Sequence, residues 1–166
     1  MKILFGLGNI GKEFKGTRHN LGEAMLRAWE EQATTDGLDG VRLIHPLGLM
    51  NNSGDDLVRE VGRPLSEVDD LVLIHDDMEL PLGECKTTVG GSAKGHNGVR
   101  SVLQALGDRE ITRLRLGIGR PTSGMTARDF VLARFRPEEK ALLGVMSERA
   151  ILLIDQFLFG VETKNN

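Results

Sequence analysis

Apolar positions along the chain fall into two alternating kinds of segment. Short apolar runs with the length and composition of strands occur at residues 2–7, 41–44, 71–74, 85–89 and 112–116. Segments with apolar residues at helical spacing alternate with them, at residues 21–32, 53–61 and 97–106 and in a long stretch that starts at Pro137. This order predicts an α/β fold, in which a mixed, mostly parallel central sheet has helices on both faces. The length of 166 residues suits a single domain spanning residues 1–166.

The predicted strand at 71–74 has the pattern of the centre of the sheet. It is a continuous apolar run flanked by acidic residues, as in a parallel strand buried on both faces. The segment 85–89 is predicted as a neighbouring strand, and 112–116, which alternates polar and apolar residues, as a half-buried one. Ligands of such sheets bind at the carboxyl ends of the strands. We therefore expect Asn9 and Asp76, which follow the first and the central strand, to lie on one rim.

Composition and the N-terminal segment predict the cellular compartment of the protein. Hydrophobic residues make up 40% and charged residues 27% of the chain, which is ordinary for a folded globular protein. The single cysteine, Cys85, cannot form an intramolecular disulfide, which favours a reducing compartment. The N-terminal apolar run at residues 3–5 is too short for a signal peptide or a membrane span. We therefore expect a cytoplasmic protein with no membrane partner.

Charge is distributed unevenly along the chain. The net charge of −3 excludes a globally basic nucleic-acid binder. From Glu84 to Arg136, however, ten basic and four acidic residues give +6, and the rest of the chain carries −9. This asymmetry predicts one face that attracts an anion. A chance split over a solvated surface is the alternative that charge alone leaves open.

The glycine-rich segment GLGNIG at residues 6–11 matches the spacing of a dinucleotide-binding loop. In that motif a helix begins inside the loop and its N-terminus meets the pyrophosphate. Residues 12–18 lack helical apolar spacing, and the second predicted strand is followed by His45 and Pro46 instead of an acid. A tight turn that delivers Asn9 to the rim is therefore favoured, and a nucleotide-binding domain is kept as an alternative.

A histidine and a carboxylate are the candidates for acid–base chemistry. His19 lies at a loop-to-helix junction, just before Asn20, which is interpreted as the cap of the helix at 21–32. A lone histidine is more often structural, but an ordinary pKa of about 6.5 suits the side chain to act as a base at cellular pH. Asp76 could accept a hydrogen bond from an imidazole, fix its tautomer and stabilise the imidazolium.

Other chemistries are less well supported by the sequence. Residues 75–79 contain one histidine and three acids, but neighbours on an extended chain point to opposite faces, so few could share one metal ion. No serine has the G-x-S-x-G context of a nucleophile elbow, and Cys85 is interpreted as a core residue. We expect neither a metal nor a cofactor.

Two further asparagines, Asn51 and Asn97, lie near glycines at loop-to-helix boundaries. Helix capping is the ordinary explanation for either one alone. An amide also offers both a donor and an acceptor without adding charge, which suits it to hold a peptide backbone or an acyl carbonyl.

Six motifs in order carry a resemblance to a known family. They are GLGNIG at 6–11, TRHN at 17–20, MNNSG at 50–54, HDDMELP at 75–81, GHNG at 95–98 and RLRLGIG at 113–119. Together they resemble the bacterial-type peptidyl-tRNA hydrolases, and the resemblance extends from Lys2 to about Phe135. That family cleaves the ester between a peptide and the 3′ end of tRNA.

The resemblance implies a metal-independent esterase, a monomer, with peptidyl-tRNA as its partner. His19 would be the general base that activates water, Asp76 its partner, and Asn9 or Asn97 would help to place the water and the developing oxyanion. The resemblance also implies a set of residues that contact the peptide, the terminal adenosine or tRNA phosphates. They are Phe14, Leu49, Asn51, Asn97, Lys94 and Arg115.

Some positions depart from the family pattern. Phe14 and Leu49 stand where the family usually has a tyrosine and another aromatic residue, and the stretch 20–51 is shorter than usual. These differences keep a second interpretation open, a protein of the same fold that binds structured RNA without cleaving it.

Overall fold

The computed structural model describes residues 1–33, 38–68, 70–107, 109–122 and 124–160. Within these ranges five strands form one sheet in the order β2-β1-β3-β5-β4. The strands are β1 (Lys2–Gly6), β2 (Val41–Ile44), β3 (Asp70–Asp77), β4 (Cys85–Val89) and β5 (Thr112–Gly117). All neighbouring pairs are parallel except β4 with β5, which is antiparallel. The predicted mixed, mostly parallel sheet is confirmed.

The predicted neighbour of the central strand is wrong. β3 is central, but β5 pairs with it and separates it from β4. β4 lies at the edge, where Lys86, Thr87 and Val89 are exposed, because its polar side chains do not fit a position buried on both faces. β5 is correspondingly more buried than its alternation predicted, and even Arg113 is only 4% exposed.

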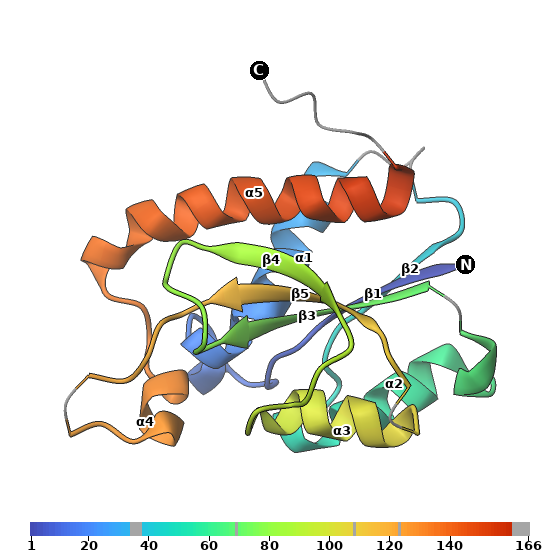
Figure 1. Ribbon diagram of the computed structural model, residues 1–166, viewed down its shortest axis with the longest axis horizontal. Coiled ribbons are helices and arrows are strands. Elements are labelled where there is room, and N and C mark those ends of the chain that lie inside the picture. Colours follow the sequence, from blue (N-terminus) through green and yellow to red (C-terminus); the bar gives the residue numbers. More distant parts are fainter. Residues whose placement is uncertain (34–37, 69, 108, 123, 161–166) are drawn as a thin grey trace.

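Helices cover both faces of the sheet, as the alternation of elements predicted (Figure 1). The helices α1 (Leu21–Gln32) and α5 (Lys140–Phe159) pack on one face, and α2 (Ser53–Val61) and α3 (Asn97–Ala105) on the other. Each side has its own apolar cluster, one around Leu26 and Met146 and the other around Leu57 and Val102. Among the described residues no helix is long and apolar enough to cross a bilayer.

A short helix absent from the sequence prediction, α4 (Ala127–Leu132), lies on the side toward which β3 and β5 point (Figure 1). Six residues are too few to show helical periodicity. Its start is fixed by the Thr126 side chain, which accepts a hydrogen bond from the Asp129 N–H at 3.1 Å, and Phe130 buries its ring in the core. The 3-10 turn Arg18–Asn20 contacts both α4 and β3, which places α4 near the central strand.

Candidate active site

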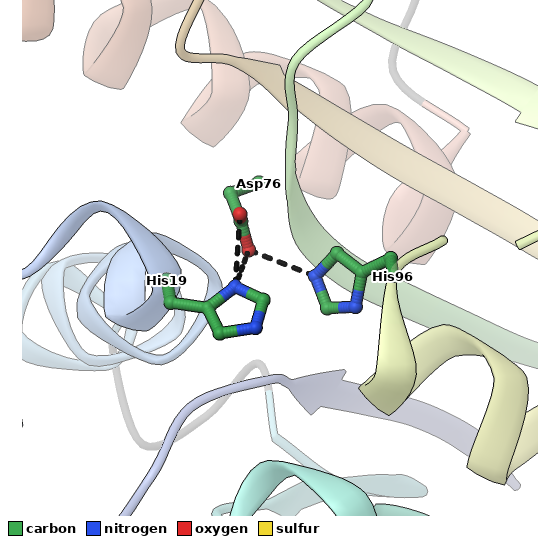
Figure 2. Close-up of side chains that lie close together, drawn as sticks. All are labelled: His19, Asp76 and His96. Carbon is green, nitrogen blue, oxygen red and sulfur yellow. Dashed lines mark hydrogen bonds and ion pairs between the residues drawn. The ribbon is translucent and has the colours of Figure 1, made fainter. Parts of the chain in front are cut away.

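His19 and Asp76 meet at the carboxyl end of the central strand (Figure 2). Nδ1 of His19 lies 3.1 and 3.0 Å from Oδ1 and Oδ2 of Asp76, whose side chain is 2% exposed. A glycine makes this approach possible. A Cβ at Gly22 would lie 2.2 Å from the carbonyl oxygen of Ile74, so only glycine lets the start of α1 come this close to β3.

A second imidazole, that of His96, contacts the same carboxylate (Figure 2). Its Nε2 lies 2.9 Å from Oδ1 of Asp76, and its Nδ1 accepts a hydrogen bond from the Val99 N–H at 3.3 Å. Because Nδ1 accepts, the hydrogen of the ring is on Nε2, which donates to Asp76. No role was predicted for His96 from the sequence. Its place in the GHNG motif at 95–98, directly before Asn97, was the available signal.

The two imidazoles decide the charge state of Asp76. Burial alone raises the pKa of this carboxyl, but its electrostatic interactions and hydrogen bonds with His96 and His19 outweigh burial and hold the pKa well below its usual range. Asp76 is therefore an ionised acceptor, and Nδ1–H of His19 donates to it. Among the described residues no group hydrogen-bonds to Nε2 of His19, so this nitrogen keeps a free lone pair.

A pocket of about 460 Å³ opens beside this cluster. Its lining includes every predicted site residue except Arg115, and these residues come from segments far apart in the sequence. These pocket residues are Asn9, Phe14, His19, Leu49, Asn51, Asp76, Lys94 and Asn97. The helix α4, which the sequence analysis missed, adds Ala127, Arg128, Val131 and Leu132 to the lining.

Arg115 lies outside the pocket lining. Its Nε donates to Oδ2 of Asp77 at 2.6 Å, and its side chain is 15% exposed. A tRNA phosphate would have to share the guanidinium with Asp77. A phosphate contact by Arg115 stays a prediction.

Asn9 is held rigidly at the rim. The side chain of Asn20 pairs with the backbone of Asn9, accepting from its N–H and donating to its carbonyl oxygen, both at 2.9 Å. Oδ1 of Asn9 accepts from the Met50 N–H at 2.7 Å, which leaves the Nδ2 donor available to the pocket. Asn20 occupies the cap position of α1, as predicted, but its side chain makes no capping hydrogen bond to the helix. The Glu23 N–H, which a cap would serve, donates to the Leu7 carbonyl oxygen at 2.9 Å instead.

Neither Asn51 nor Asn97 caps a helix. Asn97 is the first residue of α3, whose cap is His96, and Asn51 lies within the 3-10 turn Met50–Asn52 that precedes α2. Both are exposed, and Oδ1 of Asn97 accepts a hydrogen bond from Arg100 at 3.2 Å. Capping therefore does not account for either asparagine, and both side chains border the pocket.

Metal binding was considered in the sequence at residues 75–79, and these side chains do not converge. His75 bonds to Arg113, Asp77 to Arg115 and Glu79 to Arg120. Within the described ranges, His19, Asp76 and His96 do offer three ligand atoms within 4.8 Å of one another. A cation there would have to displace the hydrogen on Nε2 of His96, whose Nδ1 faces the Val99 N–H. The three side chains are thus connected by hydrogen bonds, with the ring hydrogen of His96 on Nε2.

Comparison with known proteins identifies the family of this chain. Residues 3–166 match the family model described as peptidyl-tRNA hydrolase. The chain belongs to the peptidyl-tRNA hydrolase family. This confirms the resemblance carried by the six motifs, and with it the prediction of an enzyme, a hydrolase.

Alignments with individual relatives cover most of this chain. The peptidyl-tRNA hydrolase of Geobacillus thermodenitrificans is 40% identical in an alignment of 155 residues, gaps included, that covers 84% of this chain and 83% of that protein. That of Staphylococcus epidermidis is 34% identical over 95% of this chain and 91% of its own. The crystal structure of peptidyl-tRNA hydrolase from Acinetobacter baumannii superposes with a TM-score of 0.83 at 25% identity, over 96% and 89% of the two chains.

A more distant structural likeness concerns the fold alone. The [NiFe] hydrogenase maturation protease HybD from Thermococcus kodakarensis has a TM-score of 0.52 at 16% identity, over 95% of this chain and 99% of that one. The α/β architecture is thus shared beyond the peptidyl-tRNA hydrolases.

Proposed function

We propose that this protein hydrolyses the ester between a peptide, or an N-blocked amino acid, and the 3′ end of tRNA, with His19 as general base. The observation that carries the proposal is the pairing of His19 with an ionised, buried Asp76 at a pocket edged by neutral amides. Because Nδ1–H is committed to the carboxylate, Nε2 is the nitrogen that can accept a proton. The family to which the chain belongs supports the choice of ester.

The proposed reaction uses one water molecule. Nε2 of His19 takes a proton from the water as its oxygen attacks the ester carbonyl carbon, and Asp76 stabilises the imidazolium that forms. Breakdown of the tetrahedral intermediate breaks the bond to the ribose oxygen, which receives the proton from His19. The products are the free tRNA and the peptide carboxylic acid, which then releases its proton to water.

Neutral donors suit the charge that develops on the carbonyl oxygen. Nδ2 of Asn9 is the better placed of these donors, because the bond from Met50 to its Oδ1 fixes the orientation of the amide. Donors held in place before the reaction stabilise an oxyanion without having to reorganise. Asn97 borders the same pocket and is the second candidate for this role.

Substrate contacts are proposed from the pocket walls. Phe14 and Leu49 offer apolar surface to the peptide or the terminal base, and Asn51 offers an amide. Lys94 is exposed at the rim and supplies a cation for a tRNA phosphate, a contact that gives affinity and position without reading sequence.

The test is the release of free tRNA from an N-blocked aminoacyl-tRNA. His19→Ala is expected to lower the rate by about 10²–10⁴-fold, because a positioned base is removed. His45→Ala is the matched control. His45 pairs with Glu23 and Glu30, and none of the three lines the pocket. We therefore expect His45→Ala to keep the wild-type activity. Cleavage at the normal rate by His19→Ala would overturn the assignment, and RNA binding without cleavage by the intact protein would favour the non-catalytic interpretation.

A further inference from the structure

Arg113 contributes to the basic stretch of the sequence, but it is an interior residue of the fold. It lies in β5 between β3 and β4, with 4% of its surface exposed. Its guanidinium bonds in two directions. Nε–H donates to Nε2 of His75 at 3.1 Å, and Nη1 lies 3.4, 3.1 and 2.9 Å from the carbonyl oxygens of Gly90, Gly91 and Ser92.

The contact with His75 leads directly to Asp76. Nδ1–H of His75 donates to the backbone carbonyl oxygen of Asp76 at 2.7 Å, so Nε2 is the acceptor that Arg113 requires. Burial lowers the pKa of His75 to about 3, and the positive charge of the neighbouring Arg113 acts in the same direction. The ring is therefore neutral at cellular pH, and the chain of hydrogen bonds from Arg113 to the Asp76 backbone is intact.

The contacts with residues 90–92 lead to His96. Residues 90–92 begin the loop that ends at His96. One residue of this loop has an unfavourable backbone conformation. Lys94 in this loop has a φ of 46°, the one positive φ at a non-glycine residue in the described ranges. Such conformations persist only where the surroundings hold them. The bonds from Nη1 of Arg113 to the loop are charge-assisted, the stronger class of hydrogen bond.

We propose that Arg113 is a positioning residue, which keeps Asp76 and His96 at hydrogen-bonding distance by bridging His75 and the carbonyl oxygens of residues 90–92. The inference rests on the proposed roles of His19 and Asp76, to which it adds the support behind them. Arg113 does not contact substrate in this role. It acts by holding His96 against the carboxylate that orients His19.

Arg113→Lys is the informative substitution. Lysine keeps the charge, but its compact ammonium cannot reach both His75 and the loop as the planar guanidinium does. Arg109→Lys is the matched control, because Arg109 also donates to backbone carbonyl oxygens, those of Ser66 and Val68, but outside the pocket lining. At a temperature where circular dichroism shows both variants folded, we expect kcat of Arg113→Lys to fall by about 10–100-fold, the cost of a misplaced catalytic group. KM is expected to change less than kcat, because the hydrogen bonds among Asp76, His96 and His19 act on the chemical step, and Arg109→Lys is expected to keep the wild-type kcat.

A double-mutant cycle identifies the route of the effect. If Arg113 acts through His96, the kcat of Arg113→Lys combined with His96→Ala equals that of His96→Ala alone, because residues in one network are not additive. Losses that multiply, or an Arg113→Lys variant with the wild-type kcat, would overturn the inference. His19→Ala is assayed in the same series. If it stays active the proposed function fails, whereas if it is inactive and the Arg113 effects multiply, only the role of Arg113 fails.

The protonation of His75 gives a readout that does not depend on activity. In the wild-type protein the Cε1–H resonance of His75 is expected not to titrate between pH 5 and 8, since its pKa is about 3. In Arg113→Met the loss of the neighbouring charge raises the pKa of His75, and the titration moves upward. An unchanged titration in a folded Arg113→Met protein would show that the two side chains are not coupled.

Discussion

Two carboxylates lie on either side of the turn Arg18–Asn20, and their partners differ in kind. Glu139 accepts two hydrogen bonds from Nη2 of Arg18, both at 2.9 Å, and the guanidinium also lies over the rings of Phe130 and Phe135. Asp76 accepts from the imidazoles of His19 and His96. Adjacent residues of one turn thus enter two charged clusters of similar burial.

The difference between the clusters separates structure from chemistry. A guanidinium stays charged at any working pH, so the pair of Arg18 and Glu139 has no proton to exchange. It ties the turn to the chain that follows α4, and Nη1 of Arg18 adds a bond to the Arg134 carbonyl oxygen at 2.7 Å. An imidazole can take up a proton, and His19 turns one nitrogen toward the pocket. The permanent cation is suited to hold the pocket wall, and the titratable ring to act within it.

The largest expected effect tests the chemical half of this comparison. Asp76→Asn removes the charge that stabilises a His19 imidazolium, and its amide can offer a hydrogen to Nδ1, which favours the tautomer with Nε2 protonated. We expect kcat for N-blocked aminoacyl-tRNA to fall by about 10²–10⁴-fold. Single-turnover release of tRNA measures it. A rate within tenfold of the wild-type rate would contradict the pairing.

The next effect concerns the structural half. Arg18→Met removes one partner of a largely buried ion pair, with side chains 6% and 12% exposed, and leaves Glu139 with the exposed Arg136. The free energy of unfolding should fall by about 3–5 kcal/mol, as measured by urea denaturation. In the folded variant kcat is expected to fall far less than in Asp76→Asn. An Arg18→Met protein that is as stable as the wild type but as inactive as Asp76→Asn would contradict the division into a structural and a chemical cluster.

The smallest effect is a pH dependence of stability. Burial raises the pKa of Glu139, but the hydrogen bond from the Arg136 N–H and the charge of Arg18 outweigh it and hold the pKa below its ordinary value of 4.5. A lowered pKa stabilises the fold fully above pH 4.5, and that contribution is lost as the pH falls through the folded-state pKa. Glu139→Gln should therefore be less stable than the wild type at pH 7, and the gap should narrow on acidification. Urea denaturation midpoints of the two proteins, measured from pH 7 to pH 3, check this. A stability difference that does not change with pH would exclude the ion pair as its cause.

Much of the fold follows from local patterns. The helix α1 has the predicted bounds, and the apolar run at 71–74 is the interior of the central strand β3. The resemblance to the family implied the pairing of His19 with Asp76, and each of the two lies at a recognisable boundary, one before a helix and the other at the end of a buried strand. Such boundaries are encoded within a few neighbouring residues, which is why sequence reasoning reaches them.

The errors share a physical cause. The position of β4, the burial of β5 and the pairing of Asn20 with Asn9 all depend on which segments become neighbours in space. Asn20 has the residue type and the place of a cap, but the Leu7 carbonyl oxygen already serves the amide that a cap would have bonded. The helix α4 was missed because its stability comes from Phe130 in the core and from the Thr126 cap, and not from periodicity.

The sequence by itself determined the order of the elements, the class of fold, the six motifs of the family and the two residues proposed as base and carboxylate partner. Only the tertiary structure decided that His96 shares that carboxylate, that α4 walls the pocket, and that Arg113 is an interior support and not part of a basic surface. The reason is distance along the chain. His96 is 20 residues from Asp76, and Arg113 is 38 from His75. Contacts over such separations depend on strand order and on the close packing of α1 at Gly22, which no local pattern of polar and apolar residues encodes.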